Sequence, residues 1–136
     1  MKRLLLLLLA CLCPLVLSAA EKANTALIHP GEVIYVRFSQ TGTKIKLVKA
    51  SKELDANAQV ILTLIPADPA KKNSPINLKV ENKFADDLIY KAQIRSLTEN
   101  LKMMATVYPV VAGKMSVIIL PPKVEEVAVF AFELER

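Results

Sequence analysis

Two segments alternate in chemical character at every second residue: INLKVE at 76–81 and LIYKAQIR at 88–95. In the first of them, Ile76, Leu78 and Val80 are separated by polar side chains. A β-strand places successive side chains on opposite faces, so a period of two gives one apolar face and one polar face. Both segments are therefore predicted to be half-buried strands.

The same pattern extends in both directions along the chain. The run at 60–65 is continuously apolar apart from Thr63, which is typical of a strand buried on both sides or central in a sheet. Further strands are predicted at 34–38, 44–47, 103–107, 117–120 and 128–134. Proline and glycine separate them, as turns require.

Seven or eight such strands predict an all-β fold in which two antiparallel sheets pack face to face. The alternative is a small closed β-barrel, because the number of strands alone does not separate the two. The polar segment at 66–75 is the longest predicted connection. We interpret it as a crossover between sheets, which favours the sandwich.

In the final predicted strand, the alternation assigns faces to individual residues. Period two places Ala128, Phe130, Phe132 and Leu134 together on the buried face. Glu133 and Glu135 are then expected on the wet face.

The segment 1–20 has the composition of a cleavable signal peptide. A basic start precedes an apolar run over 4–17, and small residues follow. The run has 14 residues, whereas a membrane-spanning helix needs about 20. We expect cleavage between Ala20 and Glu21. This leaves one domain over 21–136 and predicts a bacterial protein that is periplasmic or secreted.

Both cysteines of the chain, Cys11 and Cys13, lie within this predicted leader. Because Leu8-Leu9-Ala10-Cys11 resembles the box before an acylated cysteine, the alternative is a membrane-tethered lipoprotein. After cleavage at Ala20 the domain would have no disulfide and no thiolate ligand.

The remaining residues lack the usual constellations of catalysis and metal binding. His29 is the only histidine and is expected to be an exposed turn residue, whereas a zinc site needs three or four nitrogen or sulfur ligands. The acidic pairs 86–87 and 125–126 are interpreted as solvated turns. We therefore expect no catalytic site, no cofactor and no metal. Three methionines are expected to fill the core rather than bind copper: Met103, Met104 and Met115.

The clearest charged cluster consists of four lysines: Lys44, Lys46, Lys49 and Lys52. One interpretation is an interaction patch for an anionic polymer. The favoured one is that lysines on an edge strand discourage sheet-to-sheet aggregation. The net charge of the whole chain is +5. Without the leader it would be about +3, which is too mild to indicate nucleic-acid binding.

Several features follow one another in order between residues 88 and 132: a Y-x-A strand at 88–94, a Thr-to-Pro segment at 106–110, a turn at Gly113, a corner at 121–122 and a final strand through 130–132. This order resembles a group of short exported bacterial proteins of uncharacterised function that have an immunoglobulin-like β-sandwich. Leu120 stands where that group has a tryptophan. The resemblance implies fold and location, and no activity.

We therefore expect an exported, non-catalytic accessory or protein-interaction domain. Its partner would be an unidentified protein or an anionic component of the cell envelope. The alternative is a pilus or surface-fibre subunit that exchanges its terminal strand between copies. Nucleic acid is not expected as a ligand, and membrane contact is expected only if Cys11 is lipidated.

Overall fold

The computed structural model describes residues 23–96 and 98–136, which form nine strands in two antiparallel sheets. The strands are β1 (Ala26–Ile28), β2 (Val33–Thr41), β3 (Lys44–Ser51), β4 (Val60–Pro66), β5 (Ile76–Asn82), β6 (Asp87–Ser96), β7 (Leu101–Met104), β8 (Met115–Leu120) and β9 (Glu126–Glu135). The predicted signal peptide, with Cys11 and the Ala20–Glu21 cleavage site, lies outside the described residues.

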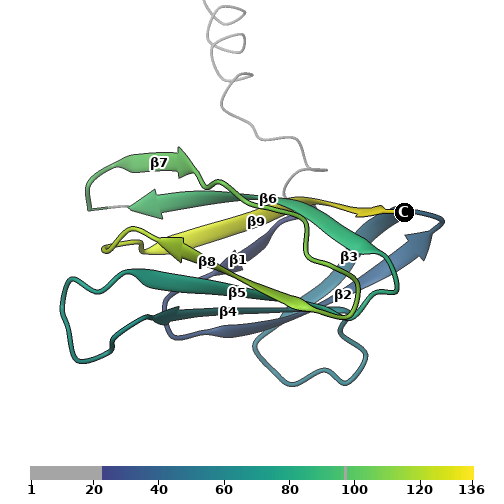
Figure 1. Cartoon of the computed structure of the whole chain (residues 1–136), viewed down its shortest axis with the longest axis horizontal. Coiled ribbons are helices and arrows are strands. Elements are labelled where there is room, and N and C mark those ends of the chain that lie inside the picture. The colour runs from purple at the N-terminus through teal and green to yellow at the C-terminus, as the bar shows by residue number, and fades with distance from the viewer. Residues whose placement is uncertain (1–22, 97) are drawn as a thin grey trace, which may run out of the picture.

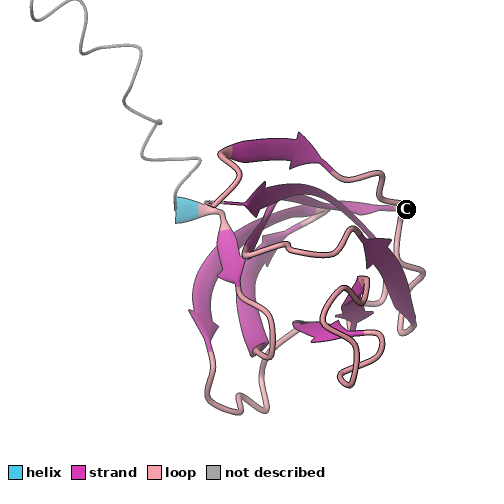
Figure 2. Ribbon diagram, turned by 90° about the vertical axis from the view of Figure 1, so that its left-hand side faces the viewer, coloured by secondary structure: helices cyan, strands magenta, loops and turns pink. Residues whose placement is uncertain are grey.

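The two sheets have different sizes and separate ladders. One has the order β1-β9-β6-β7 and the other the order β3-β2-β4-β5-β8 (Figure 1). Seen from the side, both layers curve around a common interior (Figure 2). Within the described residues no ladder joins one sheet to the other, so they are not closed into a barrel. The predicted β-sandwich is confirmed, and the barrel alternative is wrong.

The apolar run at 60–65 is a central strand, as predicted. It lies within β4, the third of five strands in its sheet. Val60, Leu62 and Leu64 are completely buried. They pack with the inward side chains of β2, β5, β6 and β9 in one core cluster. A central position is expected for a strand that has almost no polar residue to expose to water.

The predicted crossover at 66–75 is wrong. β4 and β5 pair with each other in the same sheet, from Val60 opposite Asn82 to Pro66 opposite Ile76. The segment between them is therefore a long hairpin loop. Its base is closed by the Ala67 amide, which donates to the Pro75 carbonyl at 2.8 Å. The chain changes sheets at other connections, such as the turn between β1 and β2.

The predicted burial of Phe130 beside Phe132 is also wrong, because β9 contains a β-bulge. The β6–β9 ladder shifts register between Ile89 and Lys91, and Ala131 has a positive φ of 54°. A bulge inserts one extra residue and reverses the alternation beyond it. Phe132 is 9% exposed and lies in the core, whereas Phe130 is only half-buried.

Beyond the bulge, Phe132 joins an aromatic cluster between the sheets. Its ring centroid lies 4.9 Å from that of Phe38 on β2, in an edge-to-face arrangement. Phe38 also lies 5.9 Å from Phe84, which is in the β5–β6 connection. Such geometry adds to the burial of apolar area. The cluster therefore connects β9 of one sheet to β2 of the other.

A buried polar contact also joins the two sheets. The side chain of Asn82, at the end of β5, is 2% exposed. Its Nδ2 donates to the carbonyls of Asp86 and Val110, both at 3.0 Å, and its Oδ1 accepts from the Phe84 amide at 2.9 Å. Val110 in turn pairs with Leu88 of β6. None of the described residues belongs to a helix that would reach across a bilayer.

Candidate interaction surface

The four predicted lysines lie on or just after β3, an edge strand of the five-stranded sheet. Lys44 and Lys46 are exposed opposite Thr41 and Ser39 of β2. The β2–β3 ladder shifts register between Arg37 and Phe38, and the shift brings Lys49 opposite Arg37. These three lysines therefore point to the outer face of the sheet. An edge strand with three lysines matches the aggregation-blocking interpretation.

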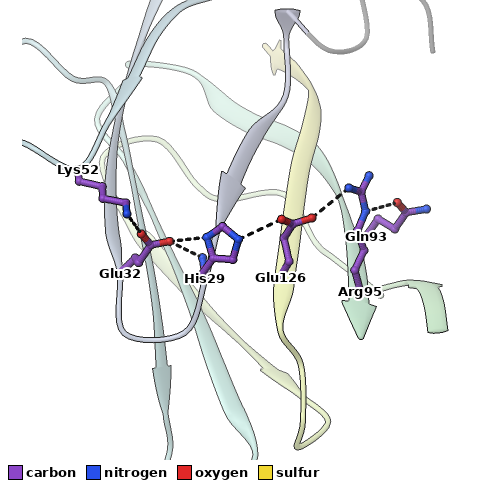
Figure 3. Close-up of polar contacts among 6 residues, drawn as sticks. All are labelled: His29, Glu32, Lys52, Gln93, Arg95 and Glu126. Carbon is purple, nitrogen blue, oxygen red and sulfur yellow. Dashed lines mark hydrogen bonds and ion pairs between the residues drawn. The ribbon is translucent and has the colours of Figure 1, made fainter. Parts of the chain in front are cut away.

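Lys52 does not extend this row of lysines. Its Nζ lies 2.5 Å from Oε2 of Glu32, in the turn before β2. That contact starts a chain of polar side chains that runs from one sheet to the other (Figure 3). The sequence placed Lys52 with the other lysines because of spacing alone. The acidic partner is distant in sequence.

His29 lies at the centre of the polar chain. Its Nδ1 is 2.8 Å from Oε1 of Glu32, and its Nε2 is 3.0 Å from Oε2 of Glu126 on β9 (Figure 3). A carboxylate only accepts hydrogen bonds, and a neutral imidazole donates through one nitrogen only. The arrangement is therefore fully hydrogen-bonded when the ring is protonated. His29 is in a turn and its side chain is 51% exposed, as expected, but the sequence did not reveal its two carboxylate partners.

The series of polar contacts continues into the four-stranded sheet. Glu126 Oε1 accepts from Arg95 Nη1 at 3.0 Å, and Arg95 Nε donates to Gln93 at 3.1 Å. Each of the two carboxylates thus contacts one basic side chain besides His29, Lys52 for Glu32 and Arg95 for Glu126. The cluster is suited to holding β1, β6 and β9 against the turn before β2.

Glu32 gives the cluster a defined dependence on pH. The hydrogen bond from Lys52 and those from the His29 backbone and ring lower the pKa of Glu32 from 4.5 to about 2, against the opposing effect of burial. A carboxyl group whose pKa is lower in the folded than in the unfolded state stabilises the fold above the unfolded value. That stability is lost as pH falls through the folded pKa.

Glu32→Gln should therefore destabilise the protein near neutral pH, and the difference from wild type should shrink as pH falls from about 4.5 to about 2. Lys52 is 74% exposed, so solvent screens the pair and we expect a loss of about 1 kcal/mol. Paired thermal melts across this range provide the measurement. A penalty that stays constant down to the lowest pH would show that the carboxylate charge does not matter.

The other acidic residues singled out from the sequence have structural contacts. Asp87 Oδ1 accepts from the Ala112 amide at 2.9 Å, and Asp86 contacts Arg136 at 3.3 Å. Glu125 accepts hydrogen bonds from the amide and hydroxyl of Thr98. Across 23–96 and 98–136, no three His, Cys, Asp or Glu side chains are arranged to hold a metal ion.

Exposed apolar side chains are concentrated in one part of the chain. Of the twelve large hydrophobic residues exposed among the described residues, eight fall between 101 and 119. This range covers β7, β8 and the connection between them, which are shown in green in Figure 1. We call these eight residues the 101–119 surface: Leu101, Met103, Met104, Tyr108, Val111, Met115, Val117 and Ile119.

The predicted core positions of three methionines are wrong. Met103, Met104 and Met115 are 42%, 50% and 60% exposed. β7 and β8 are each at the edge of their sheet, so no further strand among the described residues pairs with their outer sides. The sequence signal was a run of apolar residues, which does not say whether a neighbouring strand will cover it. Flexible methionine side chains are typical of surfaces that adapt to a binding partner.

Comparison of the chain with protein families, with curated proteins and with solved structures finds no match.

Proposed function

We propose that this chain is an exported, non-catalytic domain that binds a protein partner through the 101–119 surface. The observation that carries the proposal is the concentration of exposed apolar side chains there. Isolated surface hydrophobic residues are ordinary, whereas these eight lie on two edge strands and the connection between them, and exposed apolar side chains of this kind are typical of interaction sites. An apolar surface with methionine and tyrosine suits a protein partner better than a charged polymer.

The polar side chains support a binding role rather than catalysis. The single imidazole lies between two carboxylates, and those carboxylates also contact Lys52 and Arg95. An anionic envelope component is the competing partner, and Lys44, Lys46 and Lys49 would be its site. These lysines lie on β3, at the edge opposite β8 in the same sheet. The two candidate partners therefore predict contacts at opposite edges.

The fibre-subunit alternative meets a topological obstacle. β9, the terminal strand, lies between β1 and β6 and pairs with both. Exchange of this strand between copies would first have to break two ladders and remove Phe132 from the core. A binding surface on the edge strands β7 and β8 requires no such rearrangement.

Site-specific photo-crosslinking in the host cell tests the proposed surface. A photoreactive amino acid at Met103 or Tyr108 should give discrete protein adducts, because both side chains lie within the proposed contact. Lys44 and Lys46 are matched exposed positions on the opposite edge and should give none. Adducts at the lysine positions alone would contradict the proposal and favour the β3 edge.

Export rests on the sequence and has its own measurement. The intact mass of the protein recovered from cells should correspond to a chain that starts at Glu21. A mass that retains Cys11 together with acyl chains would instead assign the membrane-tethered form.

A further inference from the structure

The four sheet edges differ in how they are protected from pairing with another chain. β1 has three residues and β7 has four, so each offers few free backbone groups. β3 carries outward lysines and a register shift. β8 has six residues without a charge or a proline, and its ladder with β5 is regular. Lysines, shortness and bulges are the usual means of blocking an edge, and β8 has none of them.

One hydrogen bond shows which residues of β8 direct their backbone amides and carbonyls towards β5. The Asn82 amide donates to the Lys114 carbonyl at 2.8 Å, so Lys114 directs its carbonyl towards β5. The direction of these groups alternates along an antiparallel strand. Ser116, Ile118 and Leu120 therefore face β5. Met115, Val117 and Ile119 direct their amides and carbonyls to the free edge, where β8 pairs with no other described strand.

We propose that β8 pairs antiparallel with β8 of a second copy of this chain, in the register that places Val117 opposite itself. In this register Met115 lies opposite Ile119 of the other copy, and Ile119 lies opposite Met115 of the other copy. All three residues with free backbone groups then form hydrogen-bonded pairs, which gives six hydrogen bonds in principle. Shifting the centre by one residue towards the C-terminus would bring Pro121, which has no amide hydrogen, into the ladder.

The side chains on the outer face fit the same register. Met115, Val117 and Ile119 are 60%, 54% and 72% exposed on one face of β8. Pairing about Val117 would join these three side chains from each copy into one apolar band. On β5 the neighbouring positions are polar, with Asn77 opposite Ile119 and Lys79 opposite Val117. The band would thus have an apolar centre and a polar rim on both sides, as protein interfaces do.

The charges at the ends of β8 do not oppose the pairing. Lys114 precedes the strand and would lie opposite Leu120 of the other copy. The two Lys114 residues would be separated by six strand positions, or roughly 20 Å, beyond the Debye length of about 8 Å at physiological salt. Pairing of β3 with its own copy would instead bring outward lysines together. A second copy can therefore pair with the β8 edge, whereas charge repulsion opposes the same pairing at the β3 edge.

This inference rests on the proposed binding function and specifies one part of its surface. Sedimentation of the protein recovered after expression of the full chain should show a concentration-dependent species of twice the monomer mass. Val117→Lys should abolish that species, because it places two like charges at the centre of the band. Val48→Lys is the matched control, since Val48 is exposed to a similar extent, 60% against 54% for Val117, but lies on the β3 edge. Thermal melts of both variants confirm that they fold.

A cysteine at the symmetry axis tests the register. In a hydrogen-bonded antiparallel pair the Cα atoms are about 5.5 Å apart, within the range that a disulfide spans. Val117→Cys should therefore form a covalent dimer under mild oxidation. Met115→Cys should not form one, because the cysteines at position 115 of the two copies would lie four strand positions apart, at about 14 Å. The parent protein is the reference on the same non-reducing gel.

Three results would overturn the inference: a monomer at all concentrations, a dimer that persists in Val117→Lys, or equal crosslinking at positions 115 and 117. None of these results would remove the broader proposal. Photo-adducts with a different protein at Met103 or Tyr108 would still support binding through the 101–119 surface. Absence of those adducts together with a β8 dimer would limit the surface to self-association.

Discussion

Phe132→Ala should lower the free energy of unfolding by about 3–5 kcal/mol, the usual cost of deleting a buried aromatic side chain. Phe132 is 9% exposed and packs edge-to-face on Phe38, which in turn contacts Phe84. Removing its ring would leave a cavity between β9 and β2. A domain of this size has only about 5–15 kcal/mol of stability in total. Thermal denaturation should therefore show that the midpoint falls by about ten degrees or more.

The matched control is Phe130→Ala, two residues earlier in the same strand. A strict period of two predicts equal effects, because both rings would then lie on the same face. The bulge at Ala131 places Phe130 opposite Lys91 on the outer side and leaves it half-buried. We expect Phe130→Ala to cost about 1 kcal/mol, and Glu133→Ala about 0.5 kcal/mol or less. Equal losses at positions 130 and 132 would show that β9 has no bulge in solution.

Asn82→Ala should cost about 2–4 kcal/mol, which is large for the loss of a polar side chain. The substitution removes three hydrogen bonds at once and leaves the Phe84 amide without its partner, whereas the Val110 carbonyl keeps the hydrogen bond from the Leu88 amide. Each buried polar group that loses its hydrogen bond costs about 1–3 kcal/mol. Since Val110 pairs with Leu88, the loss also loosens the contact between the two sheets. Denaturant unfolding followed by circular dichroism gives the free energy.

Asn77→Ala is the control within the same strand. Its Oδ1 is buried without a hydrogen-bond partner among the described residues, so no hydrogen bond to that atom is lost. We expect its stability to remain within about 0.5 kcal/mol of wild type. If Asn77→Ala were as damaging as Asn82→Ala, the cost would reflect the loss of any amide from β5. The specific link from Asn82 to Val110 would then not be its cause.

The candidate surface was only partly predictable from the sequence. The spacing of Lys44 and Lys46 correctly indicated one shared face, but the shift that adds Lys49 depends on pairing with β2. Met103, Met104 and Met115 could not be distinguished from core residues, because exposure of an apolar strand depends on whether another strand lies beside it. His29 and Glu126 are separated by 97 positions, and no local pattern connects them.

The sequence by itself determined the class of fold and most of the strands, but β1 was not predicted and β7 lies at Leu101–Met104 rather than at 103–107. Alternation at 34–38, 76–81 and 88–95 is a property of neighbouring residues, so it indicates strands wherever they finally pair. Tertiary structure alone decided which strands are neighbours and which are edges. The segment 66–75 became a hairpin loop because β4 and β5 pair, and the bulge in β9 arose against β6. Burial of a strand's second face requires partners from distant parts of the chain, and this is why β8, apolar except for Ser116, keeps an exposed face at the edge of its sheet.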